Sequence, residues 1–122
     1  MRKRSRLSGA VAGVVFTTAL AGASPAIAAY GAIAYSASTG KYGYSYNYDS
    51  QKNAERAALK HCKVSSCKVV LWYKNACGVV AKGDTGWGAA WAGSRTQASA
   101  NAIKACSTRS RNCKAVVWSC SG

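Results

Sequence analysis

The fold of this chain is set by a segment that occurs twice. Residues 50–72 read SQKNAERAALKHCKVSSCKVVLW, and residues 94–118 read SRTQASANAIKACSTRSRNCKAVVW. Upstream of each copy lie two shorter matches, in the same order and at nearly constant spacing. They pair residues 31–34 with 78–81 and residues 42–46 with 87–91. Four ordered matches indicate a duplication into two units, and not a solenoid, which needs three or more repeats.

The first half of each unit has the pattern of a β-hairpin. A short apolar run is followed by a turn that contains glycine, and then by a strand in which large aromatic and small residues alternate. The apolar runs are Tyr30–Ser36 and Cys77–Lys82, and the turns are residues 38–40 and 83–86. We therefore expect two antiparallel strands at the start of each unit.

A helix is expected next in each unit, beginning after Ser50 or Ser94, because serine is a favourable N-cap. Ser94 and Gln97 have the spacing of a capping box, which Ser50 and Asn53 only approximate. Small residues predict that each helix lies close to its sheet. The expected sheet-facing residues are Ala54, Ala57, Ala58, His61 and Cys62 in the first unit, and Ala98, Ala102, Ala105 and Cys106 in the second.

The last segment of each unit, Lys68–Tyr73 or Lys114–Ser119, is apolar on both faces. This pattern is typical of a central strand that is covered on both sides. Each unit then has the order β-β-α-β. The expected fold is α+β, with two β-β-α-β repeats, about six strands and two helices. We expect one duplicated domain over residues 29–122, with repeats at 30–75 and 76–122.

Six cysteines occupy related positions in the two units. In each unit, two cysteines flank the link between the helix and the last strand. Their spacing differs from the two-residue spacing of zinc ribbons and knuckles, so we expect disulfides and no metal site. Six cysteines allow fifteen connectivities, and only the symmetry of the repeats favours one of them. The expected bonds are Cys62–Cys67, Cys106–Cys113 and Cys77–Cys120.

Residues 1–28 have the pattern of a secretory signal peptide. Four basic residues in positions 2–6 precede an apolar segment, Leu7–Gly22, and Ala26-Ile27-Ala28 provides a small-residue cleavage site. We expect residues 29–122 to be secreted as the mature, extracellular chain, without stable insertion in a membrane. This chain keeps thirteen lysines and arginines and three acids, a formal net charge of +10.

The opening Tyr30–Ser36, the Tyr42-Gly43-Tyr44 strand and the two Cys-Lys-x-Val-x-Trp segments resemble the exported bacterial family known as domain of unknown function 4189. The resemblance covers nearly all of the chain from Tyr30 to Cys120. It implies a secreted, disulfide-containing, duplicated β-β-α-β domain. It implies no catalytic residue, and strong positive charge is not part of the family pattern.

Few side chains are available for acid–base chemistry. His61 is the only imidazole, and Ala105 replaces it in the second copy, so we interpret it as a structural histidine on the core face of the helix. Asp49 and Glu55 lie beside a helix N-terminus and Asp84 lies in a turn, which are ordinary places for acids. We therefore expect no enzyme and no cofactor, and a small secreted hydrolase is the least favoured alternative.

Tyrosines alternate along the second strand of the first unit, at Tyr42, Tyr44, Tyr46 and Tyr48. A regular strand would point all four to one side. If that side is exposed, it is a candidate contact surface for sugars or a protein partner. We favour the other interpretation, that these side chains cover the sheet or pack between the repeats, because large aromatics dominate small cores.

Basic residues gather in two places. A ridge along the first helix, away from the alanine face, contains Lys52, Arg56, Lys60 and Lys63, and the second cysteine loop region contains Arg109, Arg111 and Lys114. Such ridges attract polyanions through long-range, salt-sensitive forces, although they also keep secreted proteins soluble. With so few acids, we favour a polyanionic partner. No nucleic-acid motif is present, so sequence-specific recognition of nucleic acid is not expected.

These observations predict a secreted, non-catalytic, basic binding protein. Its expected partner is an anionic cell-envelope polymer or a protein surface. The alternative is a secreted inhibitor or effector that docks on a partner enzyme or a host protein. Binding by charge should weaken in salt, whereas docking through aromatic side chains should not.

Overall fold

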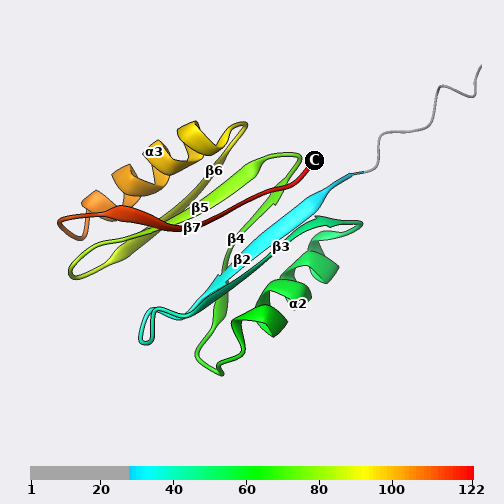
Figure 1. Cartoon of the computed structure of the whole chain (residues 1–122), viewed down its shortest axis with the longest axis horizontal. Coiled ribbons are helices and arrows are strands. Elements are labelled where there is room, and N and C mark those ends of the chain that lie inside the picture. The colour runs from blue at the N-terminus through cyan, green and yellow to red at the C-terminus, as the bar shows by residue number, and fades with distance from the viewer. Residues whose placement is uncertain (1–27) are drawn as a thin grey trace, which may run out of the picture.

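The computed structural model describes residues 28–122, so the predicted signal peptide lies outside the described residues except for Ala28. Two units with the same element order follow one another (Figure 1). The first contains β2 (Tyr30–Tyr35), β3 (Tyr42–Tyr48), α2 (Gln51–Cys62) and β4 (Lys68–Lys74). The second contains β5 (Cys77–Lys82), β6 (Trp87–Ala92), α3 (Arg95–Ser107) and β7 (Lys114–Cys120). The predicted α+β fold with two β-β-α-β repeats is confirmed.

Each unit forms an antiparallel three-stranded sheet, with order β3-β2-β4 in the first and β6-β5-β7 in the second. The central strands are therefore β2 and β5. The prediction that the last strand of each unit is central is wrong, because β4 and β7 lie at sheet edges. Their two apolar faces have another cause. Tyr73 and Val117 point into the core between the sheets, while Trp72 and Trp118 remain exposed.

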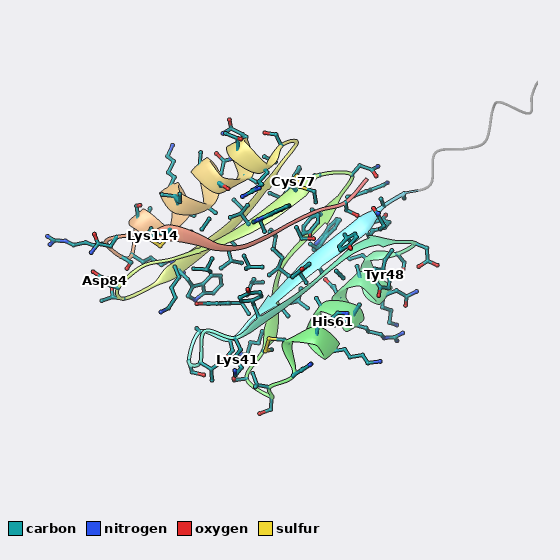
Figure 2. The ribbon with its side chains drawn as sticks, in the orientation of Figure 1. Lys41, Tyr48, His61, Cys77, Asp84 and Lys114 are labelled. Carbon is teal, nitrogen blue, oxygen red and sulfur yellow. A yellow bond between two sulfur atoms is a disulfide. The ribbon has the colours of Figure 1, made fainter. Side chains whose placement is uncertain are left out.

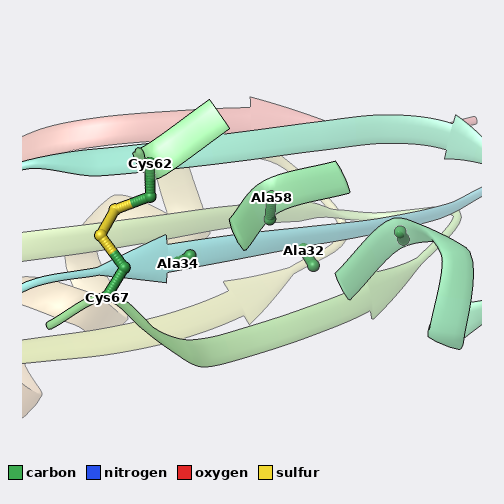
Figure 3. Packing of buried hydrophobic residues seen from close by; sticks show 6 residues of the cluster. Ala32, Ala34, Ala58, Cys62 and Cys67 are labelled. Carbon is green, nitrogen blue, oxygen red and sulfur yellow. A yellow bond between two sulfur atoms is a disulfide. The ribbon is translucent and has the colours of Figure 1, made fainter. Parts of the chain in front are cut away.

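The two sheets face each other and the helices cover their outer faces, so the layers run α2, first sheet, second sheet, α3 (Figure 1). Alternate residues of β2 serve two cores. Ala32 and Ala34 pack against Ala58 and Cys62 of α2, as Figure 3 shows. Ile33 and its neighbours instead form the core between the sheets. The members of this central core include Ile33, Tyr35, Tyr73, Val80 and Val117.

Both helices begin at the predicted serines. The Ser50 Oγ accepts a hydrogen bond from the Asn53 amide at 3.1 Å, and the Ser94 Oγ accepts one from the Gln97 amide at 3.2 Å. These bonds satisfy amides that have no partner within the helix. The Gln97 side chain donates to Asn101 instead of returning to Ser94, so the second arm of the capping box is replaced.

Glycine opposite alanine explains how closely each helix approaches its sheet. A Cβ at Gly43 would collide with the main chain of Ala58 and Cys62 in α2. A Cβ at Gly88 would collide with the main chain of Ala102 and Cys106 in α3. The close helix–sheet packing predicted from the alanine faces is therefore confirmed, and it needs glycine on the sheet as well.

All three predicted disulfides are present, as Cys62–Cys67, Cys106–Cys113 and Cys77–Cys120. Each bond lies within one repeat, and Cys77 and Cys120 are neighbours on β5 and β7. The repeats are held together by the shared core and by hydrogen bonds between β3 and the end of the chain. The Asn47 amide donates to the Ser121 Oγ at 2.7 Å, and the Gly122 amide donates to the Asn47 Oδ1 at 2.9 Å.

Residues 28–122 include no helix that is both long and apolar enough to cross a membrane.

Candidate functional site

The two sheets place equivalent loops at one end of the molecule. Tyr35 at the end of β2 pairs with Lys68 at the start of β4. Lys82 at the end of β5 pairs with Lys114 at the start of β7. The rings of Tyr35 and of Trp87, the first residue of β6, lie 5.5 Å apart between centroids. Both hairpin turns and both cysteine loops therefore lie at the same end of the two sheets, with the two cysteine loops on opposite sides of that end (Figure 1).

Basic side chains concentrate at this end, which we call the basic end. Its seven exposed members are Lys41, Lys63, Lys68, Lys82, Arg109, Arg111 and Lys114. Figure 2 shows Lys114 and Asp84 on the second sheet and Lys41 on the neighbouring hairpin of the first. Lys82 and Lys114 stand directly opposite each other on adjacent strands, where like charges repel. This arrangement lowers stability and creates a positive field.

The acidic side chains bind neutral partners. Each of the three carboxylates accepts a hydrogen bond from an amide side chain. The pairs are Asp49 with Asn53 at 3.0 Å, Glu55 with Gln51 at 3.1 Å and Asp84 with Asn112 at 2.8 Å. The positive charge at the basic end therefore faces solvent with Asp84 as its acidic neighbour.

The basic residues predicted as a binding surface fall into two groups. Arg109, Arg111 and Lys114 belong to the basic end. The helix ridge, which consists of Lys52, Arg56, Lys60 and Lys63, is exposed on the outer face of α2, opposite its buried alanines. Lys63 caps the helix and is common to both groups. The structure therefore places most of the ridge on a different face from the arginines.

Sequence reasoning missed Lys41, Lys68 and Lys82. Lys68 had a detectable signal, because it follows Cys67 as Lys114 follows Cys113 in the second copy. Lys41 and Lys82 had none, since their position at the basic end depends on how the two sheets face each other.

His61 is exposed, so its interpretation as a core histidine is wrong. Ala58 and Cys62 contact the sheet, and His61 is rotated by about 100° from Cys62 around the helix. The imidazole therefore lies at the side of α2 and lines a shallow hollow with Tyr42 and Tyr44. Within residues 28–122 the carboxylates bond to the amide side chains of Asn53, Gln51 and Asn112, and none has a hydrogen bond to His61.

Tyr42, Tyr44 and Tyr46 are exposed by 42–53%, so they are not buried in the core, although they lie at the border between the repeats. Tyr42 and Tyr44 share the face of Tyr35 and Ile33, which is turned towards the second sheet. Because β3 is an edge strand, these rings border a groove and are not covered. This edge groove, of about 430 Å³, is lined by Tyr42, Tyr44 and Tyr46 of β3 and by Val116 and Trp118 of β7.

Trp118 and Val116 were not identified from the sequence as part of an aromatic surface. The matching positions of Trp72 and Trp118 were visible as a repeat, but their exposure was not. In the structure the guanidinium of Arg95 lies 4.0 Å from the centroid of the Trp118 ring. Such a contact is a favourable cation–π interaction that fixes the orientation of the indole.

Tyr48 is separated from the other tyrosines by a register shift. Ser45 pairs with Ala32, but Tyr48 pairs with Tyr30, two residues earlier on β2. The extra residue is accommodated at Asn47, whose φ is 60°. Since paired residues share a face, Tyr48 lies on the helix-facing side of the sheet. The expectation that all four tyrosines point to one side is wrong for Tyr48.

Metal ligands are not assembled in residues 28–122, where no three histidine, cysteine, aspartate or glutamate side chains come together as a possible metal site. The six cysteines are all used in disulfides. The chemistry that this part of the chain offers is therefore charge, hydrogen-bond donors and aromatic surface.

Comparisons with known proteins agree with this architecture. A family model described as "Domain of unknown function (DUF4189)" matches residues 30–120. Protein Rv1269c of Mycobacterium tuberculosis (strain ATCC 25618 / H37Rv) and Protein Mb1300c of Mycobacterium bovis (strain ATCC BAA-935 / AF2122/97) are each 47% identical over 55 residues, which cover 45% of this chain and 43% of theirs. The chain therefore spans less than half the length of the curated relatives it matches. The NMR structure of Rv1813c from Mycobacterium tuberculosis is similar with a TM-score of 0.59 and 30% identity, over 80% of this chain and 78% of that one.

Proposed function

We propose that this chain, which belongs to the family described as a domain of unknown function (DUF4189), is a secreted, non-catalytic binding protein whose basic end attaches to an anionic polymer of the cell envelope. The observation that carries the proposal is the gathering of seven exposed bases from both repeats at one end. Charges that repel one another in the free protein are favourable once a polyanion lies across them. The three disulfides support an oxidising compartment and hence secretion.

The scaffold holds this charge in a fixed arrangement. The Cys62–Cys67 bond closes the loop that begins at Lys63, and the Cys106–Cys113 bond closes the loop that contains Arg109 and Arg111. The second loop also bonds to the turn after β5, where the Asp84 amide donates to the Arg111 carbonyl at 2.9 Å. Loops that are ordered before binding lose less conformational entropy when the polymer binds.

The test is binding of residues 29–122 to immobilised polyphosphate and polyglutamate, with uncharged dextran as the control, at low and at high salt. We expect binding to both anionic polymers at low salt, a steep loss of affinity as salt rises, and no binding to dextran. If residues 29–122 bind neither polyphosphate nor polyglutamate at low salt, the proposal is overturned.

A second candidate function is docking on a protein surface, as expected of an inhibitor or effector. The observation that favours it is the edge groove, because exposed tyrosine and tryptophan rings are typical anchors of protein interfaces. Association with a purified envelope protein that survives high salt and is lost in Tyr44→Ala, but not in Lys82→Gln, would favour this candidate over polymer binding.

A further inference from the structure

One buried hydroxyl lies at the joint between the repeats. Tyr35 is only 3% exposed, and within the described residues its hydroxyl has no hydrogen-bond partner. A buried polar group without a partner costs free energy, and such groups are rare in folded proteins. The Tyr35 hydroxyl is therefore a candidate donor for a bound molecule.

Tyr35 lines a cleft of about 480 Å³, which is within the size range of small-molecule sites. We call it the inter-repeat cleft. One wall is formed by Tyr35 and Ala37 from the first repeat. The other is formed by residues 82–87, which are the β5–β6 turn and one strand residue on each side of it, together with Arg109. Lys82 occupies the position in the second repeat that Tyr35 has in the first, so the duplication brings a phenol and an ammonium group to one place.

Three of the four main-chain amides of the turn are already in use. Gly83 donates to the Gly86 carbonyl at 2.8 Å, Asp84 donates to the Arg111 carbonyl at 2.9 Å, and Thr85 donates to the Ser110 Oγ at 2.8 Å. Most donors left for a ligand are therefore side chains. They are the hydroxyl of Tyr35, the ammonium group of Lys82 and the guanidinium of Arg109.

These three donors match an anionic group. Burial raises the pKa of Tyr35, so its hydroxyl keeps its proton and acts as a donor. The planar guanidinium of Arg109 matches the geometry of a carboxylate or a phosphate, and Lys82 adds a second positive charge. The exposed position of both cations allows a ligand to enter from solvent.

The remaining groups of the cleft select for more than charge. The ring of Trp87 packs against Tyr35 and offers an apolar face on which the C–H face of a sugar ring can lie. The Asp84 carboxylate binds the Asn112 amide through one oxygen, which leaves acceptor capacity for hydroxyl groups. A bare inorganic anion would use only the cationic part of this cleft and would be repelled by Asp84.

We propose that the inter-repeat cleft binds one acidic sugar unit, a hydroxylated ring that carries a carboxylate or a phosphate, with the anionic group on Tyr35, Lys82 and Arg109 and the ring beside Trp87. This inference rests on the proposed function, because Lys82 and Arg109 belong to the basic end. It identifies the recognised polymer as an acidic polysaccharide or a sugar-phosphate polymer.

The test is calorimetric titration of residues 29–122 with glucuronate, glucose 6-phosphate, glucose and inorganic phosphate. We expect at least one of the two acidic sugars to bind more tightly than both glucose and inorganic phosphate, and the tighter of the two identifies the anionic group. Tyr35→Phe keeps the ring and removes only the hydroxyl. We expect it to weaken binding of that sugar by about tenfold, the effect of one hydrogen bond to a charged group.

Two controls keep the experiment decisive. Lys104→Gln removes one charge from the outer face of α3, away from the cleft, and should leave the sugar affinity within about twofold of the wild type. Thermal unfolding of Tyr35→Phe without ligand should show a melting temperature equal to or above that of the wild type, because no internal hydrogen bond is lost.

The inference is overturned if neither acidic sugar binds, if inorganic phosphate binds as tightly as both, or if Tyr35→Phe binds them like the wild type. With any of these results, continued binding of polyphosphate or polyglutamate would leave the proposed function intact. Loss of all polymer binding in the wild type would instead overturn the proposed function.

Discussion

Tyr73 shows how a single side chain breaks the symmetry of the duplication. Its ring lies against Gly31 and Gly78, the matching glycines of the two central strands, and a Cβ at either would collide with it. The matching residue of the second repeat is Ser119. The hydroxyls of Tyr73 and Ser119 both donate to the Ser45 carbonyl, at 3.1 and 3.4 Å. The space between Gly31 and Gly78 has room for one large ring, so the two units are not interchangeable.

Gly78→Ala tests this packing. The added methyl group has to displace the Tyr73 ring at the centre of the core, so we expect a loss of about 1–3 kcal/mol in the free energy of unfolding. Gly93→Ala is the matched control, because a Cβ there meets open space. Urea denaturation should show the control to be as stable as the wild type or slightly more stable. Equal stability of the two variants would contradict the packing.

Tyr73 also gives a pH dependence in the alkaline range. Burial raises its pKa to about 12, from the ordinary value of 10.0. Since the folded-state pKa is the higher one, the stabilisation is complete below pH 10 and is lost as pH rises from 10 to about 12. We expect the free energy of unfolding of the wild type to fall over this interval by about 2–3 kcal/mol more than that of Tyr73→Phe. If the free energy of unfolding falls equally with pH in the two proteins, the raised pKa of Tyr73 is contradicted.

Roles that depend only on neighbouring residues in the sequence were predicted correctly. Positions that depend on how the elements pack were not. Ser50 and Ser94 act as caps because capping depends on a few neighbouring amides. His61 and Tyr48 were misplaced for a different reason. The exposure of His61 depends on the exact rotation of α2 over the sheet, and the face of Tyr48 depends on the bulge at Asn47.

Among the elements, the edge positions of β4 and β7 could not be read from their apolar pattern. Periodicity shows that both faces of a strand are apolar, but it does not show whether a sheet, a helix or solvent lies opposite. In β4, Tyr73 is covered by the second sheet while Trp72 is exposed on the other face. The edge groove has the same origin, because β3 and β7 lie at edges that face each other across the two sheets.

The disulfides were predictable because the duplication restricts their pairing, and their energetic ranking follows from loop length. The Cys77–Cys120 bond spans a sequence separation of 43, against 5 for Cys62–Cys67. In the chain-entropy model, the long bond stabilises by about 4 kcal/mol and the short one by about 2 kcal/mol. We expect the double variant Cys77→Ala/Cys120→Ala to have a lower denaturation midpoint than Cys62→Ala/Cys67→Ala. The reverse order would show that the short bond stabilises more than loop entropy accounts for.

For the whole molecule, the important property is that two similar units lie side by side with the same ends together. Each unit alone carries a few basic residues around its hairpin and its cysteine loop. The contact between Tyr35 and Trp87 places the basic residues of both units at the same end of the molecule, and together they form the basic end. The sequence gives the number of charges, but their gathering depends on the packing of one sheet on the other, which no local pattern encodes.

Two basic residues outside the basic end stabilise the fold. Lys60 and Lys104 lie in the last turns of α2 and α3, where a positive charge interacts favourably with the helix dipole. This explanation does not apply to Lys68, Lys82 and Lys114, which lie at strand ends, Lys82 directly opposite Lys114 and Lys68 opposite Tyr35. The repulsion between Lys82 and Lys114 raises the energy of the free protein, which is the feature on which the proposed binding of a polyanion rests.

The comparison of two triple variants with equal charge loss locates the binding surface. One replaces Lys68, Lys82 and Lys114 at the basic end with glutamine, and the other replaces Lys52, Arg56 and Lys60 on the helix ridge. The quantity measured is the affinity for polyphosphate as a function of salt. We expect the basic-end variant to lose at least about tenfold more affinity at low salt, with a salt slope smaller by about 1 for each lysine removed. Equal losses in the two variants, or a larger loss from the helix ridge, would contradict binding at the basic end.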